Sequence, residues 1–197
     1  LHKQGHVMVE KRLNRVLDFA MEFEMDRLFH LNFLGYSVFQ TSRRGEYEGN
    51  RVASRARLEG MISRYTGMGL LHEIREQLEK VLTSVFHGKY VGCLGVDMMI
   101  YEDESGGFGV QPCVEINLRY NMGIVSIALQ RFLQEEVEGV FTIRFSPKPG
   151  EIMQSVEENR DAYPLQVKTG RITAGYINLT PVSRESRFVA ELYVGDK

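Results

Sequence analysis

The feature of the sequence that most constrains its fold is a strict alternation of large apolar residues with small or acidic ones near the start. The alternating stretch is DFAMEFEMD, residues 18–26. Its large apolar members are Phe19, Met21, Phe23 and Met25. Successive side chains of a strand point to opposite faces, so this period of two predicts a strand with one buried face. The first quarter of the chain is therefore predicted to be β-sheet.

The remaining sequence predicts further strands with two helices between them. Runs typical of strands lie at residues 7–13, 29–40, 90–102, 110–118, 140–145, 172–179 and 188–194, and around residue 165. Apolar residues at three- and four-residue spacing predict helices over residues 70–85 and 123–137. Residues 41–66 hold six arginines and three glycines with little apolar periodicity, which predicts a long loop. We therefore expect an α+β fold with a mostly antiparallel sheet and packed helices.

The composition excludes two classes of partner. The 24 basic and 26 acidic side chains give a formal net charge of -2, without the basic excess typical of nucleic-acid-binding proteins. The longest apolar runs are far shorter than the ~20 residues that a membrane-spanning helix needs. The polar opening LHKQGH does not resemble a secretory signal. We expect no nucleic-acid partner, no membrane and a cytoplasmic location.

Two acidic residues are predicted to face each other across a hairpin formed by residues 90–118. Its turn, DESGGFG, is rich in glycine, and a turn centred near Gly106 places Asp97 opposite Glu115 in antiparallel pairing. Because side chains alternate along a strand, Asn117 shares their face. The sequence thus predicts two carboxylates and an amide within a few ångströms of one another.

This carboxylate pair is a candidate metal site. Opposed carboxylates destabilise a strand pair unless a cation, a proton or water lies between them. Two carboxylates and an amide offer oxygen ligands, which suit Mg²⁺. Arg119 lies two residues further along and could clamp a phosphate or an oxyanion there. Spacing alone equally allows a solvated Asp97, a Glu115 paired with a nearby arginine and an Asn117 that caps a turn.

The arginine-rich segment is a second candidate site. Four of its residues could bind a carboxylate or phosphate substrate, because an arginine fork holds such groups in bidentate geometry. They are Arg43, Arg44, Tyr47 and Asn50. The alternative is that these side chains are simply solvated. The five histidines lack the spacing of a zinc site, and no serine lies in a Gly-x-Ser-x-Gly motif, so a zinc site and a serine hydrolase are both unsupported.

The acidic motifs carry a resemblance to a known family. The segments GVDMMIYE and CVEINLR, with VMVEKRL and Asp18 upstream, resemble the C-terminal part of an ATP-grasp carboxylate ligase. The Glu-x-Asn-x-Arg form is similar to the branches of carbamoyl-phosphate synthase and biotin carboxylase. The likeness covers most of residues 6–137. It implies an ATP-grasp-like C-terminal lobe over residues 1–146, with residues 147–197 as an antiparallel β tail of the same domain.

The resemblance implies that the start of the chain contacts the nucleotide ATP. Glu10 would lie near the adenine amine and Asp18 near the ribose. Backbone contacts at the hinge would come from Lys11, Arg12 and Leu13. Without the resemblance, Glu10 would be interpreted as a surface strand residue and Asp18 as a turn residue.

The resemblance also implies that the hairpin binds the metal and the reacting groups. Asp97, Glu115 and Asn117 would coordinate the Mg²⁺ ions that bridge the phosphates of ATP, with Mn²⁺ as an alternative metal. Arg119 would be the catalytic residue that clamps the phosphorylated intermediate.

The function implied is that of an ATP- and Mg-dependent ligase, which activates a carboxylate as an acyl phosphate for attack by an amine or similar nucleophile. In the family, a preceding N-terminal lobe supplies phosphate-binding lysines and a glycine-rich lid, and no such segment precedes Glu10. We therefore expect a fragment that is inactive alone and whose partner is the missing N-terminal lobe. The alternative is a non-catalytic ATP-grasp-like domain that binds nucleotide or acts as a scaffold. A homodimer is compatible with the sequence.

Overall fold

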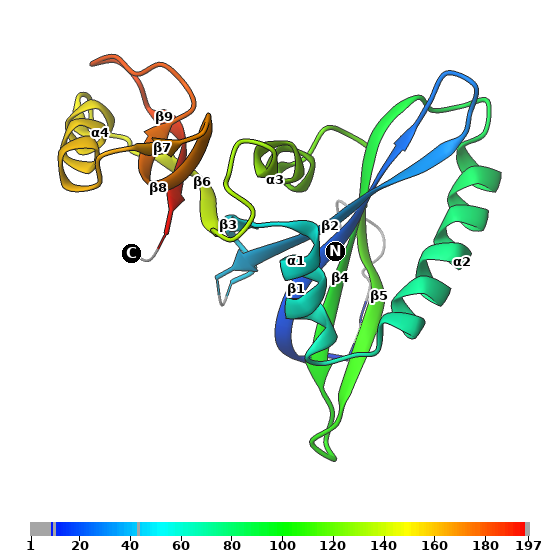
Figure 1. Cartoon of the computed structure of the whole chain (residues 1–197). Helices are drawn as coiled ribbons and strands as arrows, with labels where there is room; N and C mark the ends of the chain where they lie inside the picture. The colour runs from blue at the N-terminus through cyan, green and yellow to red at the C-terminus, as the bar shows by residue number, and fades with distance from the viewer. Residues whose placement is uncertain (1–8, 10, 43, 196–197) are drawn as a thin grey trace, which may run out of the picture.

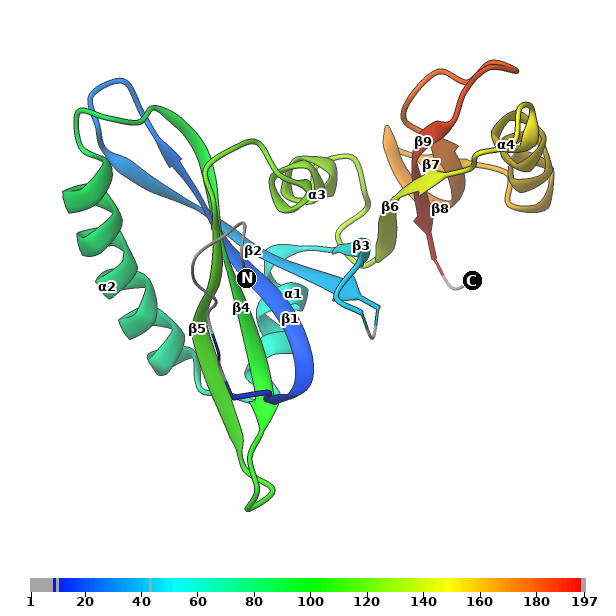
Figure 2. The same cartoon turned by 180° about the vertical axis from the view of Figure 1, so that it is seen from behind.

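The protein forms one nine-stranded sheet with helices packed on it, in a computed structural model that describes residue 9, residues 11–42 and residues 44–195 (Figures 1 and 2). The strand order in this sheet is β5-β4-β1-β2-β3-β6-β9-β8-β7, with antiparallel neighbours. The strands are β1 (Asn14–Met25), β2 (Leu31–Thr41), β3 (Tyr47–Val52), β4 (Gly92–Glu102), β5 (Phe108–Asn117), β6 (Gly139–Phe145), β7 (Gln166–Lys168), β8 (Arg171–Asn178) and β9 (Phe188–Val194). The helices are α1 (Arg55–Ser63), α2 (Met68–Phe86), α3 (Met122–Gln130) and α4 (Glu151–Ala162). The predicted α+β class with a mostly antiparallel sheet is confirmed.

One face of the sheet holds the largest hydrophobic core. Phe19, Met21 and Phe23 of β1 are fully buried there, as their alternation predicted. The two helices that cover this face contribute Leu58, Ile62, Leu71 and Leu82. Burying each such side chain stabilises the fold by about 1.5–3 kcal/mol, so this cluster fixes α1 and α2 against the sheet.

The opposite face of β1 is also buried, which the alternation did not predict. Ala20 and Glu22 point to this face and are each only 1% exposed. Helix α3 packs across them, and its Gly123 lies against the Glu22 carboxylate. The prediction of a strand with one buried face is therefore wrong, because α1 and α2 pack on one face of β1 and α3 packs on the other.

The second half of the sheet has smaller cores of its own. Strands β7, β8 and β9 confirm the antiparallel strands predicted near residue 165 and over residues 172–179 and 188–194. Strand β9 pairs with β6, so these residues continue the same sheet. Helix α4, which was not predicted, packs Ile152 and Val156 against this end. The division of the chain at residue 146 remains a prediction.

The predicted loop over residues 41–66 is largely wrong. Strand β3 and helix α1 occupy most of it. Strand β3 is stabilised by ladders to β2 and β6 on either side, which the sequence pattern cannot display. Helix α1 buries only Leu58 and Ile62, one turn apart, so its apolar periodicity is too sparse to detect.

The remaining boundaries agree in part. The helix predicted over residues 70–85 is confirmed as α2, whereas the one predicted over 123–137 ends at Gln130. Most of the strand predicted over residues 7–13 lies outside the described residues, and residues 9 and 11–13 are not in a strand.

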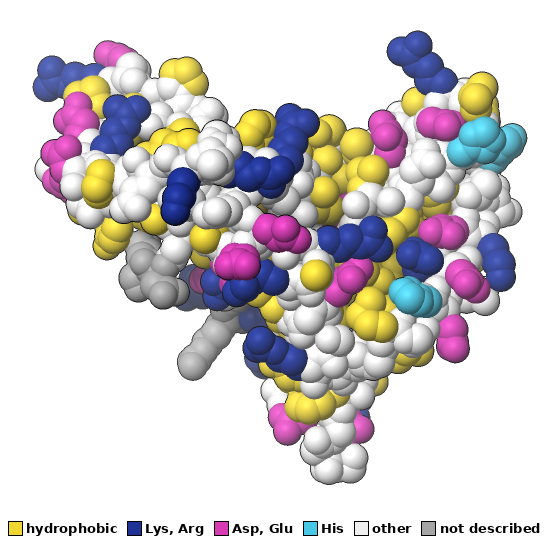
Figure 3. Space-filling view, in the orientation of Figure 1, with side chains coloured by type: hydrophobic (Ala, Val, Ile, Leu, Met, Phe, Trp, Pro, Cys, Tyr) yellow, Lys and Arg dark blue, Asp and Glu magenta, His cyan; other side chains and the backbone are white. Residues whose placement is uncertain are grey.

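The surface gives two further findings. Within the described ranges, no helix combines the length and the apolar character needed to cross a bilayer. On the face of the molecule drawn in Figure 3, basic and acidic side chains are interspersed over most elements.

The core on the helix-covered face can be tested by truncation. We expect Phe23→Ala to lower the free energy of unfolding by about 3–5 kcal/mol, because a large ring is lost from a fully buried position. Leu28→Ala is the matched control, since Leu28 is 72% exposed in the turn after β1. Urea denaturation of both variants checks this, and equal effects would contradict the described packing.

Candidate functional site

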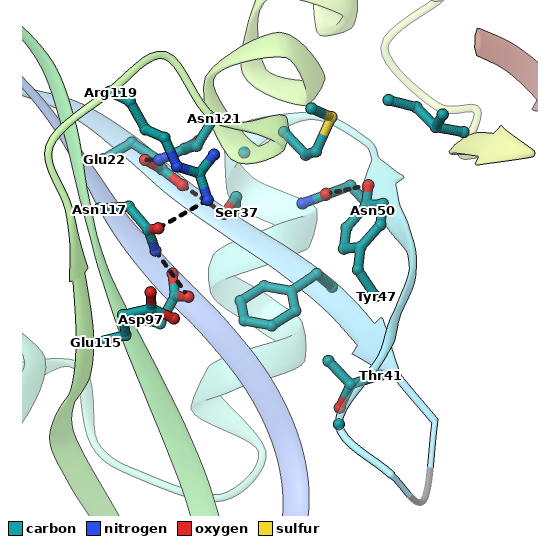
Figure 4. Close-up of a pocket in the computed structure, with 15 residues that line it drawn as sticks. Glu22, Ser37, Thr41, Tyr47, Asn50, Asp97, Glu115, Asn117, Arg119 and Asn121 are labelled. Carbon is teal, nitrogen blue, oxygen red and sulfur yellow. Dashed lines mark hydrogen bonds between the residues drawn. The ribbon is translucent and has the colours of Figure 1, made fainter. Parts of the chain in front are cut away.

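The face of the sheet that carries α3 brings polar side chains into register across five strands. Ala20 of β1 pairs with Asp97 of β4, and Asp97 pairs with Glu115 of β5. One row further along, Glu22 pairs with Gly95. Directly paired residues of antiparallel strands point to the same face, so these side chains converge on the same side of the sheet. Figure 4 shows Glu22, Asp97 and Glu115 among the residues around one cavity.

Asp97 and Glu115 face each other, as the hairpin predicted. Asp97 is partly buried, and burial, followed by the charge of Glu115, raises its pKa to about 6. The Asn117 hydrogen bond and the Arg119 charge lower this pKa, but only in part. Because the negative charge of Glu115 disfavours ionisation of Asp97, a cation bound beside the two carboxylates would be stabilised.

Asn117 and Arg119 extend the carboxylate pair along β5 and beyond its end. The amide Nδ2 of Asn117 donates to Asp97 Oδ2 at 3.1 Å, and Arg119 Nη2 donates to Asn117 Oδ1 at 2.9 Å. The guanidinium of Arg119 is therefore held over the same wall by a chain of hydrogen bonds. This arrangement places a positive charge beside the carboxylates, where an anion could also bind.

Glu22 is a third carboxylate in the wall, and the sequence analysis missed it. Ser37 Oγ donates to Glu22 Oε1 at 2.9 Å, and Asn121 Nδ2 donates to Oε2 at 2.8 Å. Burial raises the pKa of Glu22 to about 7, although both hydrogen bonds lower it. A Cβ at Gly123 would collide with this carboxylate, so glycine is needed where α3 crosses it.

The first turn of α3 is fixed to the same carboxylate. Asn121 precedes the helix and accepts a hydrogen bond from the Ile124 backbone N–H through Oδ1. Its other amide atom donates to Glu22, so one side chain joins the helix cap to strand β1. A side-chain cap of this kind contributes about 1 kcal/mol and directs the start of the helix toward the cavity.

Tyr47 and Asn50 of β3 form the opposite wall of the cavity. The Tyr47 hydroxyl donates to Asn50 Oδ1 at 2.6 Å, and burial raises the pKa of Tyr47, so the hydroxyl remains a donor. Asn50 is 1% exposed, and its Nδ2 has no hydrogen-bond partner among the described residues. In Figure 4 this nitrogen points away from Tyr47 and toward the cavity, so it is available to an acceptor on a ligand.

The cavity joins these groups in one volume of about 500 Å³. Six of the predicted site residues line this cavity, on two of its walls. The hairpin wall holds Asp97, Glu115, Asn117 and Arg119, and the β3 wall holds Tyr47 and Asn50. Such a volume, with convergent polar groups and perturbed carboxylates, is typical of a ligand site.

The other predicted residues lie elsewhere. Asp18 accepts from the Thr41 hydroxyl at 2.6 Å and forms an ion pair with Arg15 at 3.2 Å, at the edge of the cavity wall. Residues 11–13 line a separate hollow beside the tip of the β4–β5 hairpin. A third hollow is lined by Arg44 together with Arg12 and Leu13. Glu10 and Arg43 lie outside the described residues.

The donor set agrees with Mg²⁺ better than with a softer metal. Among the described residues, no three His, Cys, Asp or Glu side chains gather closely enough to hold a metal by themselves. Asp97 and Glu115 supply two carboxylates, and Asn117 would supply its oxygen after turning from Arg119. An incomplete set of oxygen ligands suits Mg²⁺, which usually keeps waters and takes phosphate oxygens.

The signal that could have revealed Glu22 is weak. The alternation of apolar residues in β1 predicted that Glu22 is exposed. Only the pairing register of the strands shows that Glu22 lies beside Gly35 of β2 and Gly95 of β4. Glycines on both neighbouring strands leave room for a closely packed helix. Without the register, neither glycine could be assigned to that face.

Comparison with known proteins gives a likeness in structure but not in sequence. No protein-family model and no curated protein match the chain. Rhizobium etli pyruvate carboxylase with its activator acetyl coenzyme-A is 13% identical, with a TM-score of 0.52 over 94% of this chain and 18% of that chain. N5-carboxyaminoimidazole synthetase from Staphylococcus aureus with ADP is 13% identical, with a TM-score of 0.47 over 95% and 48%. The L-amino acid ligase from Bacillus licheniformis is 12% identical, with a TM-score of 0.44 over 91% and 47%.

These likenesses bear on the fold alone. The match to pyruvate carboxylase covers almost all of this chain, so the chain shares the fold of the matched part of that structure. This agrees with the predicted resemblance to ATP-grasp carboxylate ligases. The chain spans about half the length of the synthetase structures that it matches.

The buried Glu22 carboxylate predicts a dependence of stability on pH. Its pKa rises from 4.5 to about 7 on folding, so its contribution to stability is complete below pH 4.5 and is lost as the pH rises through about 7. At about 1.4 kcal/mol per pKa unit, the loss is about 3 kcal/mol. We therefore expect Glu22→Gln to be more stable than the wild type at pH 8 by up to about that amount.

The measurement is urea denaturation of the wild type and Glu22→Gln at pH 4.5 and pH 8, in the absence of metal. Glu24→Gln is the control, since Glu24 is exposed on the same strand. If the difference in the free energy of unfolding between the wild type and Glu22→Gln does not grow with pH, the raised pKa of the buried Glu22 carboxylate is contradicted.

Proposed function

We propose that the protein is part of an ATP- and Mg-dependent ligase that activates a carboxylate as an acyl phosphate for attack by an amine or similar nucleophile. The observation that carries the proposal is the opposed Asp97–Glu115 pair, with Asn117 and Arg119 on the wall of one cavity. The fold of ATP-grasp carboxylate ligases supports the same class of reaction.

The carboxylate wall is proposed to hold Mg²⁺ with the phosphates of ATP. The ion would be bound by the oxygens of Asp97 and Glu115 and by the amide oxygen of Asn117. When bound, Mg²⁺ neutralises charge on the phosphates during transfer. A divalent cation held by these residues would offset the repulsion between Asp97 and Glu115.

The nucleotide is proposed to approach over the start of the chain. By the family resemblance, Glu10 would lie near the adenine amine and Asp18 near the ribose. Backbone contacts at the hinge would come from Lys11, Arg12 and Leu13. Lys11 and Glu104 form an exposed ion pair at 2.9 Å, which borders the hollow that residues 11–13 line. That hollow is separate from the carboxylate cavity. Adenine and the phosphates would therefore bind in two different hollows of the chain.

The hairpin wall and the β3 wall of the cavity are proposed to orient the carboxylic acid substrate. Arg119 would clamp the acyl phosphate, and the free Nδ2 of Asn50, fixed by Tyr47, would donate to an oxygen of the substrate. A buried donor without a partner costs about 1–3 kcal/mol, which an acceptor on the substrate would offset. Arg43 and Arg44 are proposed to attract the acid from solution.

Several features of the whole protein remain proposals. They are a second, N-terminal lobe that completes the ATP site, a cytoplasmic location and a homodimer. Mn²⁺ is proposed as an alternative to Mg²⁺ because it accepts the same oxygen ligands.

A hydroxylamine trap tests the proposed reaction without knowledge of the natural nucleophile. The full-length protein would be incubated with ATP, Mg²⁺, hydroxylamine and one of a panel of carboxylic acids. We expect ADP and a hydroxamate to form together with at least one acid. Glu115→Gln should lower the rate about 100-fold or more, because the metal-binding wall loses a charge.

The control variant is Glu73→Gln, because Glu73 is exposed on α2, away from the cavity. It should leave the rate of hydroxamate formation unchanged. If the protein binds MgATP in a thermal-shift assay but forms no hydroxamate with any acid, the ligase proposal is overturned in favour of a non-catalytic domain.

A further inference from the structure

The Glu22 carboxylate is the titratable group of the cavity for which the proposed chemistry above has no use. Its two hydrogen bonds come from neutral donors, Ser37 and Asn121. Within the described part of the chain, Glu22 forms no ion pair. A carboxylate that is 1% exposed and lacks a cationic partner is costly, which points to a functional reason for its retention.

Its oxygens have acceptor capacity left. A carboxylate offers about four lone-pair positions, and the protein uses one on each oxygen. The carboxylate forms part of the cavity wall, between the start of α3 and strand β2. A donor on a ligand, such as an ammonium or amine N–H, would therefore find an acceptor there.

The other groups of the wall cannot easily take a proton. In the proposed reaction Asp97 and Glu115 bind the metal, and Arg119 acts as a hydrogen-bond donor, as it does to Asn117. Tyr47 keeps its proton, because burial raises its pKa and its hydroxyl donates to Asn50. Among the described residues that line the cavity, Glu22 is the remaining base.

The charged surroundings of Glu22 are few. Across the ladder, Asp97 on β4 is the charged group that raises its pKa, and the Cys93 thiol lies on the same strand. The groups that face it from β2 and α3 are the neutral Ser37, Asn121 and Gly123. Burial therefore affects the pKa of Glu22 more than any single neighbouring group does.

We propose that Glu22 is the general base that binds and deprotonates the amine nucleophile, so that the acceptor of the ligase is a primary amine. The proposal rests on the proposed function. Glu22 takes one proton from the ammonium, and the freed lone pair forms the C–N bond at the acyl carbon. The C–O bond to phosphate breaks, and phosphate leaves with its electron pair and takes the second proton from nitrogen. Glu22 then returns its proton to water.

The test compares two nucleophiles that differ in their need for a base. Hydroxylamine is largely neutral at pH 7 and attacks without help, whereas an ordinary amine is protonated. The acid found by the hydroxylamine trap would be offered to the full-length protein with ATP, Mg²⁺ and, in turn, each of the twenty amino acids and methylamine. We expect Glu22→Gln to form amide about 100-fold more slowly than the wild type, and hydroxamate within about threefold of its rate.

The two rates also separate a chemical role from a structural one. Glu22→Gln can still accept from Asn121 through its amide oxygen and donate from its amide nitrogen to the Ser37 hydroxyl. Retained hydroxamate formation reports that the variant is folded. Glu24→Gln, at an exposed position two residues further along the strand, should change neither rate. Glu22→Asp, which keeps a carboxylate, should recover part of the amide formation that Glu22→Gln loses.

Three outcomes would overturn the assignment. Equal loss of amide and hydroxamate in Glu22→Gln would mean that Glu22 acts only by holding Asn121 and α3. Unchanged amide formation would mean that another base acts. No amide from any amine, with hydroxamate still formed by the wild type, would exclude a primary amine as acceptor. Failure of the ligase proposal itself is distinct, because the wild type would then form no hydroxamate.

Discussion

The burial of strand β1 on both faces is the constraint on which the rest of the structure depends. Its large apolar residues hold α1 and α2, and its small and acidic residues lie beneath α3. Glycines at positions 35 and 95 on the neighbouring strands, and Gly123 on the helix, let the backbone of α3 approach. The same close approach traps the carboxylate of Glu22, so packing and chemistry meet at one residue.

The cavity is a place where stability and function oppose each other. Three carboxylates, Glu22, Asp97 and Glu115, line one wall, and Arg119 is the single basic side chain among the described residues that line the cavity. Burial of Glu22 and Asp97 makes their ionisation costly, as their raised pKa values indicate. A cation bound there would stabilise the protein as well as complete the site. This is the kind of local conflict in which a fold retains groups that its core would not select.

How much could be predicted from the sequence differs between the two walls. The pairing of Asp97 with Glu115 was predicted correctly, although the turn is centred one residue earlier than assumed, because Glu102 pairs with Phe108. Two extra residues in β5 after Gln111 compensate for this shift and bring Glu115 opposite Asp97. Glu22 could not be predicted, because the face of a strand that a distant helix covers is not encoded in its alternation. Strand β3 was missed for a related reason, since its stability comes from two partner strands far along the chain.

The extra residues in β5 have a second effect, at the margin of the described sheet. Strand β5 is an edge strand, and its exposed side chains include Val114 and Ile116. A long apolar edge would invite another chain to add to it and lead to aggregation. Pro112, which has no N–H to donate, lies in the irregular stretch and breaks the row of free hydrogen-bonding groups. The extra residues in β5 that align Asp97 with Glu115 therefore also shorten the length of regular edge strand to which another protein chain could add.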